Sequence, residues 1–197
     1  MKADTANRRR IWLGNVASFT VAGLAASILV GGSLGYLGTS LGLDGTGNVA
    51  IAIVVAVIVT ASARELGLRA VPLLQARRQT AGIWARRLGP RKAAVLWGID
   101  LGLFVTTWQS LAGAWLVPVL ALLAASPGFG ALLFASYWLG RASSVWVAPL
   151  LAPAAAGIPE LMQALADSRR ASRYVHVGAL GWAAVIVIAI AGQGGSV

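Results

Sequence analysis

The sequence predicts an all-α, polytopic membrane helix bundle with about five transmembrane helices, and three observations lead to this prediction. Hydrophobic residues make up 58% of the 197 residues and charged residues only 11%, a balance far from that of a soluble domain. The apolar residues form long continuous runs without the alternation that barrel strands require. The basic residues gather in alternate connections between these runs. We therefore interpret residues 1–197 as a single integral membrane domain.

Five apolar runs are long enough to cross a hydrocarbon core about 30 Å thick, which takes roughly 20 helical residues. They lie at about residues 14–37, 48–64, 94–118, 130–151 and 174–192. The first run follows Arg8, Arg9 and Arg10 as in a signal peptide. Because it exceeds the roughly 7–15 apolar residues of a signal peptide, we expect a retained first helix.

The positions of the 16 basic residues predict the topology. Four precede the first run, eight lie from Arg64 at the end of the second run to Lys92 before the third, and three lie between the fourth and fifth. The positive-inside rule then places the N-terminus in the cytoplasm and the C-terminus outside. The basic cytoplasmic loop, residues 65–92, should attract anionic lipid at about 1 kcal/mol per basic residue near the surface. This location accounts for the net charge of +10 without nucleic-acid binding. The excess of Arg over Lys, with abundant Ala, favours a bacterial plasma (inner) membrane.

Small residues recur every four positions in the first run, at Gly23, Ser27, Gly31 and Gly35. Such a face lets another backbone approach closely, so we expect packing within the fold, with a dimer interface as the alternative. The second run is short, β-branched and almost featureless, and it is expected to face lipid. After the fourth run, Pro159 and apolar residues at helical spacing predict an interfacial helix at about 159–172.

The third run stays apolar from residue 93 to 125, which is about 50 Å if helical throughout and too long for one straight crossing. Gly113 and Pro118 are the predicted helix kink, because Pro removes a backbone hydrogen bond. The kinked helix carries a patch of polar side chains, namely Thr106, Thr107, Gln109 and Ser110.

Two charged residues lie inside the predicted spans at similar depths. Trp97 and Trp146 suit the cytoplasmic interface. Asp100 then lies roughly 5 Å inside the third span, and Arg141 roughly 8 Å inside the fourth. Because charges inside a membrane usually face the bundle and pair, we predict an Asp100–Arg141 ion pair. It can be a structural link or a gate that opens during a conformational change.

The run from Gly98 to Arg141 resembles the second half of the cytochrome c biogenesis and DsbD-type transmembrane family (CcdA-like). In that family a kinked helix precedes a helix with a G-x-L-L-x-x-Y-x-L-G pattern. The similar residues here are Gly130, Leu132, Leu133, Tyr137, Leu139 and Gly140, with one more residue between Leu133 and Tyr137 than in the family pattern. Gly178 and Gly181 are similar to glycines of the family's last helix. The resemblance covers residues 93–190 and implies a helix bundle whose bend faces an internal cavity.

The chain departs from this family at its reactive residue. Leu111 stands where the family's kink carries a redox cysteine, and Ser110 and Ala114 replace the flanking prolines, whereas Gly113 is retained. Since the chain contains no cysteine, thiol exchange is excluded. The family also has six spans, whereas five are predicted here.

The remaining chemistry favours a protein that is not an enzyme and has no cofactor. One histidine and no cysteine give no transition-metal site, and the six acidic residues are scattered along the chain. One hypothesis is a transporter-like carrier with a path for a small polar or ionic solute, formed by the kinked third helix, its polar patch, Asp100 and Arg141. The alternative is a non-transporting accessory or assembly subunit, whose small-residue faces pack on other membrane proteins and whose basic loop docks a cytoplasmic partner.

Overall fold

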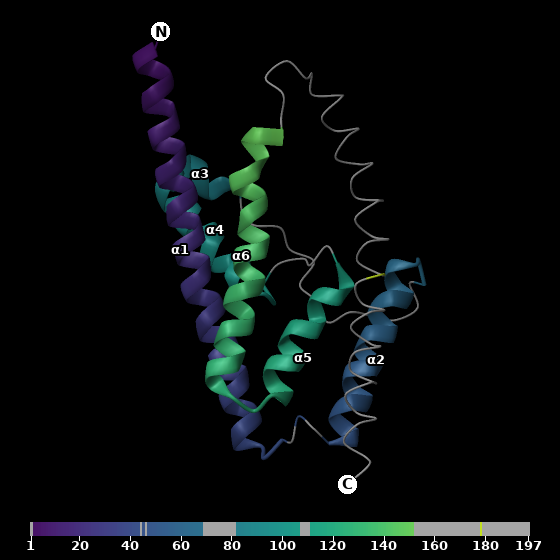
Figure 1. Cartoon of the computed structure of the whole chain (residues 1–197). Helices are drawn as coiled ribbons and strands as arrows, with labels where there is room; N and C mark the ends of the chain where they lie inside the picture. The colour runs from purple at the N-terminus through teal and green to yellow at the C-terminus, as the bar shows by residue number, and fades with distance from the viewer. Residues whose placement is uncertain are drawn as a thin grey trace.

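The computed structural model of the protein describes residues 2–43, 45, 47–68, 82–106, 111–151 and 178. Every secondary-structure element in these ranges is a helix, so the all-α prediction is confirmed (Figure 1). Several predictions fall outside the described residues. They are the interfacial helix at about 159–172, the fifth span at 174–192 apart from Gly178, and the polar residues Thr107, Gln109 and Ser110.

The first two predicted spans are continuous helices. Helix α1 runs from Lys2 to Ser40 and α2 from Asn48 to Glu65. Among the described residues, Arg9–Ser40 and Asn48–Glu65 are the two segments long and apolar enough to cross a membrane. The chain leaves α1 at Gly42, whose φ of 62° is accessible to glycine. This turn lets the Leu43 N–H donate a 3.1 Å hydrogen bond back to the Gly38 carbonyl.

The third predicted span is divided into several helices. Its first half is α4, Pro90–Gly102, preceded by the short α3, Ile83–Leu88. Its second half is the 3₁₀ helix η1, Ala112–Trp115, followed by α5, Leu116–Leu123. The helix therefore breaks between Gly102 and Ala112, upstream of the predicted kink. Gly113 lies in η1, and Pro118 is the third residue of α5, where its missing N–H is tolerated.

Helix α6, Pro127–Leu151, corresponds to the fourth predicted span and begins three residues earlier. Ser126 caps its N-terminus: its Oγ accepts a 3.4 Å hydrogen bond from the Phe129 N–H, and its carbonyl a 2.9 Å bond from Gly130. Pro127 follows the cap, a position where a missing N–H costs little. The helix start is therefore determined locally by the Ser–Pro pair.

Helix α1 is the central element, and it packs against α4, α5 and α6 (Figure 1). Gly31 of α1 and Gly130 of α6 cross so closely that a Cβ on either would meet the carbonyl of the other. A Cβ on Gly23 would meet the Trp138 ring, and one on Gly35 the Ser126 carbonyl. Ser27 donates a 3.1 Å hydrogen bond to the carbonyl of Gly102 in α4. The predicted packing of this small-residue face within the fold is confirmed.

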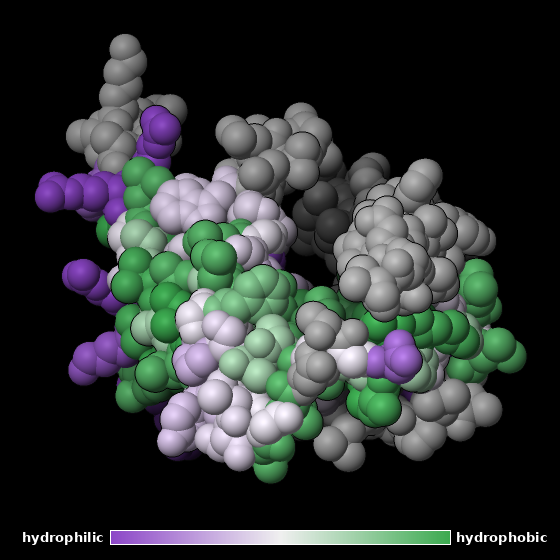
Figure 2. Space-filling model, turned by 60° about the horizontal axis from the view of Figure 1, so that its bottom comes forward, coloured by the Kyte–Doolittle hydropathy of each residue, from purple (hydrophilic) through white to green (hydrophobic). Residues whose placement is uncertain are grey.

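Helix α2 belongs to a second packing layer and contacts η1 and α5. One cluster of buried residues joins α2 to η1 and α5, with Ile58 and Ala61 at its centre. A second cluster surrounds Phe104, Ala121 and Phe134. In the space-filling view most strongly hydrophilic side chains project from one edge of the described part, and the rest of that face is apolar or weakly polar (Figure 2). Because α5 contacts both α1 and α2, it connects this second layer to the helices packed around α1.

Candidate functional site

The break after α4 is centred on Phe104. Helix α4 closes with a 2.9 Å hydrogen bond from the Leu103 N–H to the Ile99 carbonyl. Phe104 then adopts a φ of 65° although its side chain is only 1% exposed. This left-handed conformation costs a bulky L-residue roughly 1–2 kcal/mol. The surrounding structure must offset that cost.

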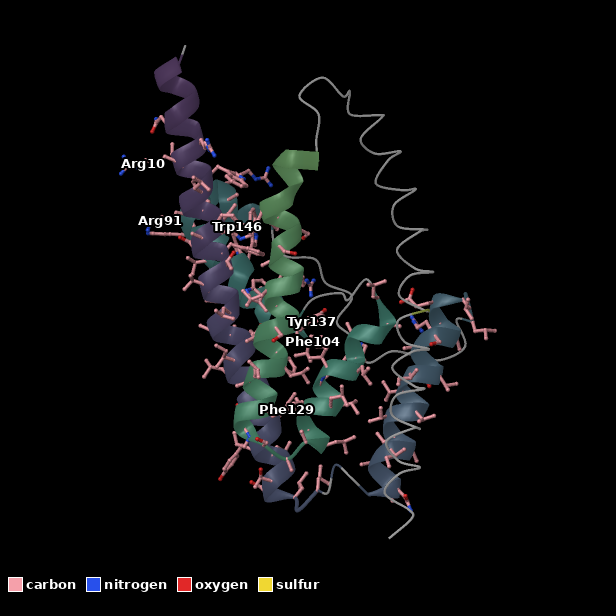
Figure 3. The ribbon with its side chains drawn as sticks, viewed as in Figure 1. Arg10, Arg91, Phe104, Phe129, Tyr137 and Trp146 are labelled. Carbon is pink, nitrogen blue, oxygen red and sulfur yellow. The ribbon has the colours of Figure 1, made fainter. Side chains whose placement is uncertain are left out.

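Aromatic contacts from two other elements hold Phe104 in place. Its ring centroid lies 5.4 Å from that of Trp115 in η1, 5.8 Å from Phe134 and 5.7 Å from Tyr137, both in α6. Figure 3 shows Phe104 and Tyr137 next to each other beside α6. These separations lie in the favourable range for edge-to-face and tilted pairs. The break is therefore part of the packed interior.

Polar groups surround this aromatic cluster. Asp100, in the last turn of α4, is only 5% exposed. Thr106 Oγ1 donates a hydrogen bond to the Asp100 main-chain carbonyl, one of the carbonyls that a helix end leaves without an intrahelical donor. On α6, half-buried Arg141 hydrogen-bonds to the hydroxyl of Tyr137. Of the four residues in the predicted polar patch, Thr106 is the one that the structure describes, and it lies just after the end of α4.

The structure puts Asp100 and Arg141 at a similar level along α1. Gly102 and Trp138 both approach α1 at Gly23. Asp100 lies two residues before Gly102 and Arg141 three residues after Trp138, or about 3 and 4.5 Å from that level. Both displacements are toward the N-terminal end of α1, because α4 runs parallel and α6 antiparallel to α1. The direct Asp100–Arg141 ion pair stays a prediction.

Glu65 is a site residue that sequence reasoning did not identify. It is the last residue of α2, and its Oε1 accepts a 2.6 Å hydrogen bond from the Ala112 N–H at the start of η1. A carboxylate is stabilised at the N-terminal end of a helix by the free N–H groups and the dipole. No local signal identifies this contact, because the two residues are 47 positions apart.

A groove of about 350 Å³ lies between α2 and the η1–α5 segment. Thr60, Ala61, Ala112 and Trp115 are among the residues that line it. The indole N–H of Trp115 is buried and has no acceptor within the described part of the chain. A buried donor of this kind is rare in native proteins.

The described residues contain no group of three or more His, Cys, Asp or Glu side chains that could hold a metal ion. Comparisons with protein-family models, curated proteins and solved structures found no match. The resemblance to the CcdA-like family stays a prediction.

Substituting Glu65 tests its capping role. Glu65→Ala leaves the Ala112 N–H without its acceptor and is expected to lower the free energy of unfolding by about 1.5–3 kcal/mol, the range for hydrogen bonds to charged groups. Glu65→Gln keeps an acceptor oxygen and should lose about half as much. Chemical unfolding in detergent, followed by circular dichroism, measures both. Equal losses for the two variants would contradict the capping role.

Proposed function

We propose that the protein is a small multi-pass carrier of the bacterial plasma membrane, with five spans, a cytoplasmic N-terminus and an external C-terminus. Its broken third span lines a path for a small polar or ionic solute. The outer surfaces of the helices support a lipid environment. Leu29 of α1 is 70% exposed and Val49 of α2 75% exposed, and Leu132 of α6 is also exposed. Exposed apolar residues on three helices are expected where lipid covers them.

The observation that carries the proposal is a buried carboxylate at a helix break. Asp100 is buried in the last turn of α4, and Arg141 of α6 lies at the same level of α1. Ionisable residues within membrane spans are expensive and usually mark substrate or ion pathways. Discontinuous helices form the binding sites of many transporters, because their free backbone groups can coordinate solutes. The α4–η1–α5 segment supplies both features in one place.

The accessory-subunit alternative has less support. It relied on small-residue faces that pack on other membrane proteins, but Gly23, Gly31 and Gly35 of α1 are occupied by α4 and α6 of the same chain. The remaining support for the accessory-subunit alternative is the basic loop, residues 65–92, as a docking surface for a cytoplasmic partner. A carrier is therefore the better interpretation of the interior polar groups.

Thiol accessibility tests the carrier directly, because the chain has no native cysteine. Single variants Thr106→Cys and Thr60→Cys place the only thiol at the break and in the α2–α5 groove. We expect both to react with a membrane-impermeant, cationic methanethiosulfonate reagent added to sealed vesicles, because the thiolate forms only where water reaches the sulfur.

Two control variants define a dry background. Val59→Cys lies on an exposed position of α2 that would face lipid, and Ala121→Cys lies in the core of α5. Both should stay unmodified until the protein is denatured. If Thr106→Cys and Thr60→Cys react no faster than these controls from either side of the membrane, the interior is dry and the carrier is rejected.

A further inference from the structure

A second groove lies between α1, α4 and α6, near the N-terminal half of α1. It has a volume of about 380 Å³, within the range of about 300–1,000 Å³ that is typical of small-molecule sites. Its lining is almost entirely apolar and includes Phe19 of α1, Trp97 and Leu101 of α4 and Val145 of α6. Such a lining suits a hydrocarbon chain.

Exposed basic residues directly follow two of the residues that line the groove. Ala85 and Pro90 line it, and the next residues in the chain, Arg86 and Arg91, are exposed. Further exposed basic residues at this end are Arg9, Arg10, Arg87 and Lys92. Figure 3 shows Arg10 and Arg91 extending outward on the same side of α1.

Carboxylates do not neutralise this charge within the described part. The acidic side chains described there are Glu65, which is hydrogen-bonded at the C-terminal end of α2, and Asp100, which is buried in α4. The exposed basic cluster suits an anionic ligand. The occupant of the groove must combine a hydrocarbon chain with a negative group at one end.

An aromatic pair marks a level that suits a lipid headgroup. The rings of Trp12 and Trp146 pack edge to face with centroids 6.1 Å apart, and the Trp146 indole N–H donates a 3.0 Å hydrogen bond to Thr20 Oγ1. Tryptophan is enriched at the membrane–water interface, where its ring is apolar and its N–H polar. The basic residues lie on the same side as this pair, next to the N-terminus of α1.

We propose that this groove binds one acyl chain of an anionic phospholipid, whose phosphate is held by Arg86 and Arg91. The apolar lining excludes a free phosphate as the main ligand, and the exposed basic residues favour an anionic over a zwitterionic headgroup. The lining contains none of the residues assigned to the proposed solute path, so lipid binding does not depend on whether the protein carries a solute.

Quenching by brominated lipid tests the proposal. The full-length protein is reconstituted in phosphatidylcholine vesicles that contain either phosphatidylglycerol or phosphatidylcholine with dibrominated acyl chains. Brominated phosphatidylglycerol should quench tryptophan fluorescence more strongly than brominated phosphatidylcholine. The difference should shrink in Trp97→Phe, because Trp97 lines the groove. The preference should fall about fivefold for each charge removed in Arg86→Gln and Arg91→Gln.

Two further variants separate the groove from general surface charge. Val145→Phe fills the groove without changing charge and should abolish the preference, whereas Val59→Phe on α2 should leave it unchanged. Arg64→Gln removes one charge away from the groove and should also leave it unchanged. Equal quenching by both lipids, equal loss in Arg64→Gln and Arg91→Gln, or full competition by soluble glycerol phosphate would each overturn the proposal.

Discussion

Phe104→Ala is expected to lower the free energy of unfolding by about 3–5 kcal/mol, the cost of removing a fully buried phenylalanine. The ring is 1% exposed and contacts the rings of Trp115, Phe134 and Tyr137. Alanine keeps the strain of the positive φ but loses all three contacts, each worth about 0.5–1.5 kcal/mol beyond the area buried. The segment between α4 and η1 should therefore lose its fixed geometry before the rest of the bundle unfolds.

The measurement is chemical unfolding of the purified protein in detergent, with near-ultraviolet circular dichroism as the signal of aromatic packing. Phe129→Ala is the matched control, because Phe129 is half exposed near the start of α6 (Figure 3). It should cost less than about 1 kcal/mol. A loss at Phe104 no larger than that at Phe129 would show that the aromatic cluster does not hold the break.

Gly31→Val is expected to have the second large effect, a loss of about 3 kcal/mol or complete failure to assemble. The Cβ of valine would meet the carbonyl of Gly130, a backbone atom that no side-chain rotation can move. Inserting methyl groups into a packed interface typically costs about 1–3 kcal/mol. We expect the upper end of this energy range, because α1 and α6 would have to move apart where they cross.

Gly140→Val controls for the change in helix propensity, since nothing lies within 4 Å of a Cβ at Gly140. The two variants are compared by size-exclusion chromatography and by thermal unfolding in the same detergent. Gly140→Val should elute and melt like the wild type. If both variants behave alike, close backbone contact does not hold α1 against α6.

The helices and one interface were predictable from the sequence because their signals are local. Continuous apolar runs predicted α1 and α2, and the four-residue spacing of small residues predicted the face of α1 that packs within the bundle. The similar depth of Asp100 and Arg141 also followed from counting residues from two tryptophans. These inferences need only helical geometry.

The position of the break and the role of Glu65 could not be predicted because both depend on long-range contacts. The sequence offers Gly113 and Pro118 as helix breakers, whereas α4 ends at Gly102 and the left-handed residue is Phe104. No propensity favours phenylalanine there. Its conformation is stabilised by rings that arrive from η1 and α6. Similarly, the acceptor for the Ala112 N–H comes from the end of α2.

The central position of α1 has a consequence for how the chain matures. α1 and α2 leave the ribosome first, but α1 packs on α4, α5 and α6, and α2 on η1 and α5. Neither can bury its contact face until residues beyond Pro90 have been synthesised. In the proposed membrane protein, the glycine-lined surface of α1 would face lipid or the insertion machinery during that interval. Lateral assembly would then follow insertion, as in two-stage folding of membrane proteins, and translation of the second half of the protein would govern its timing.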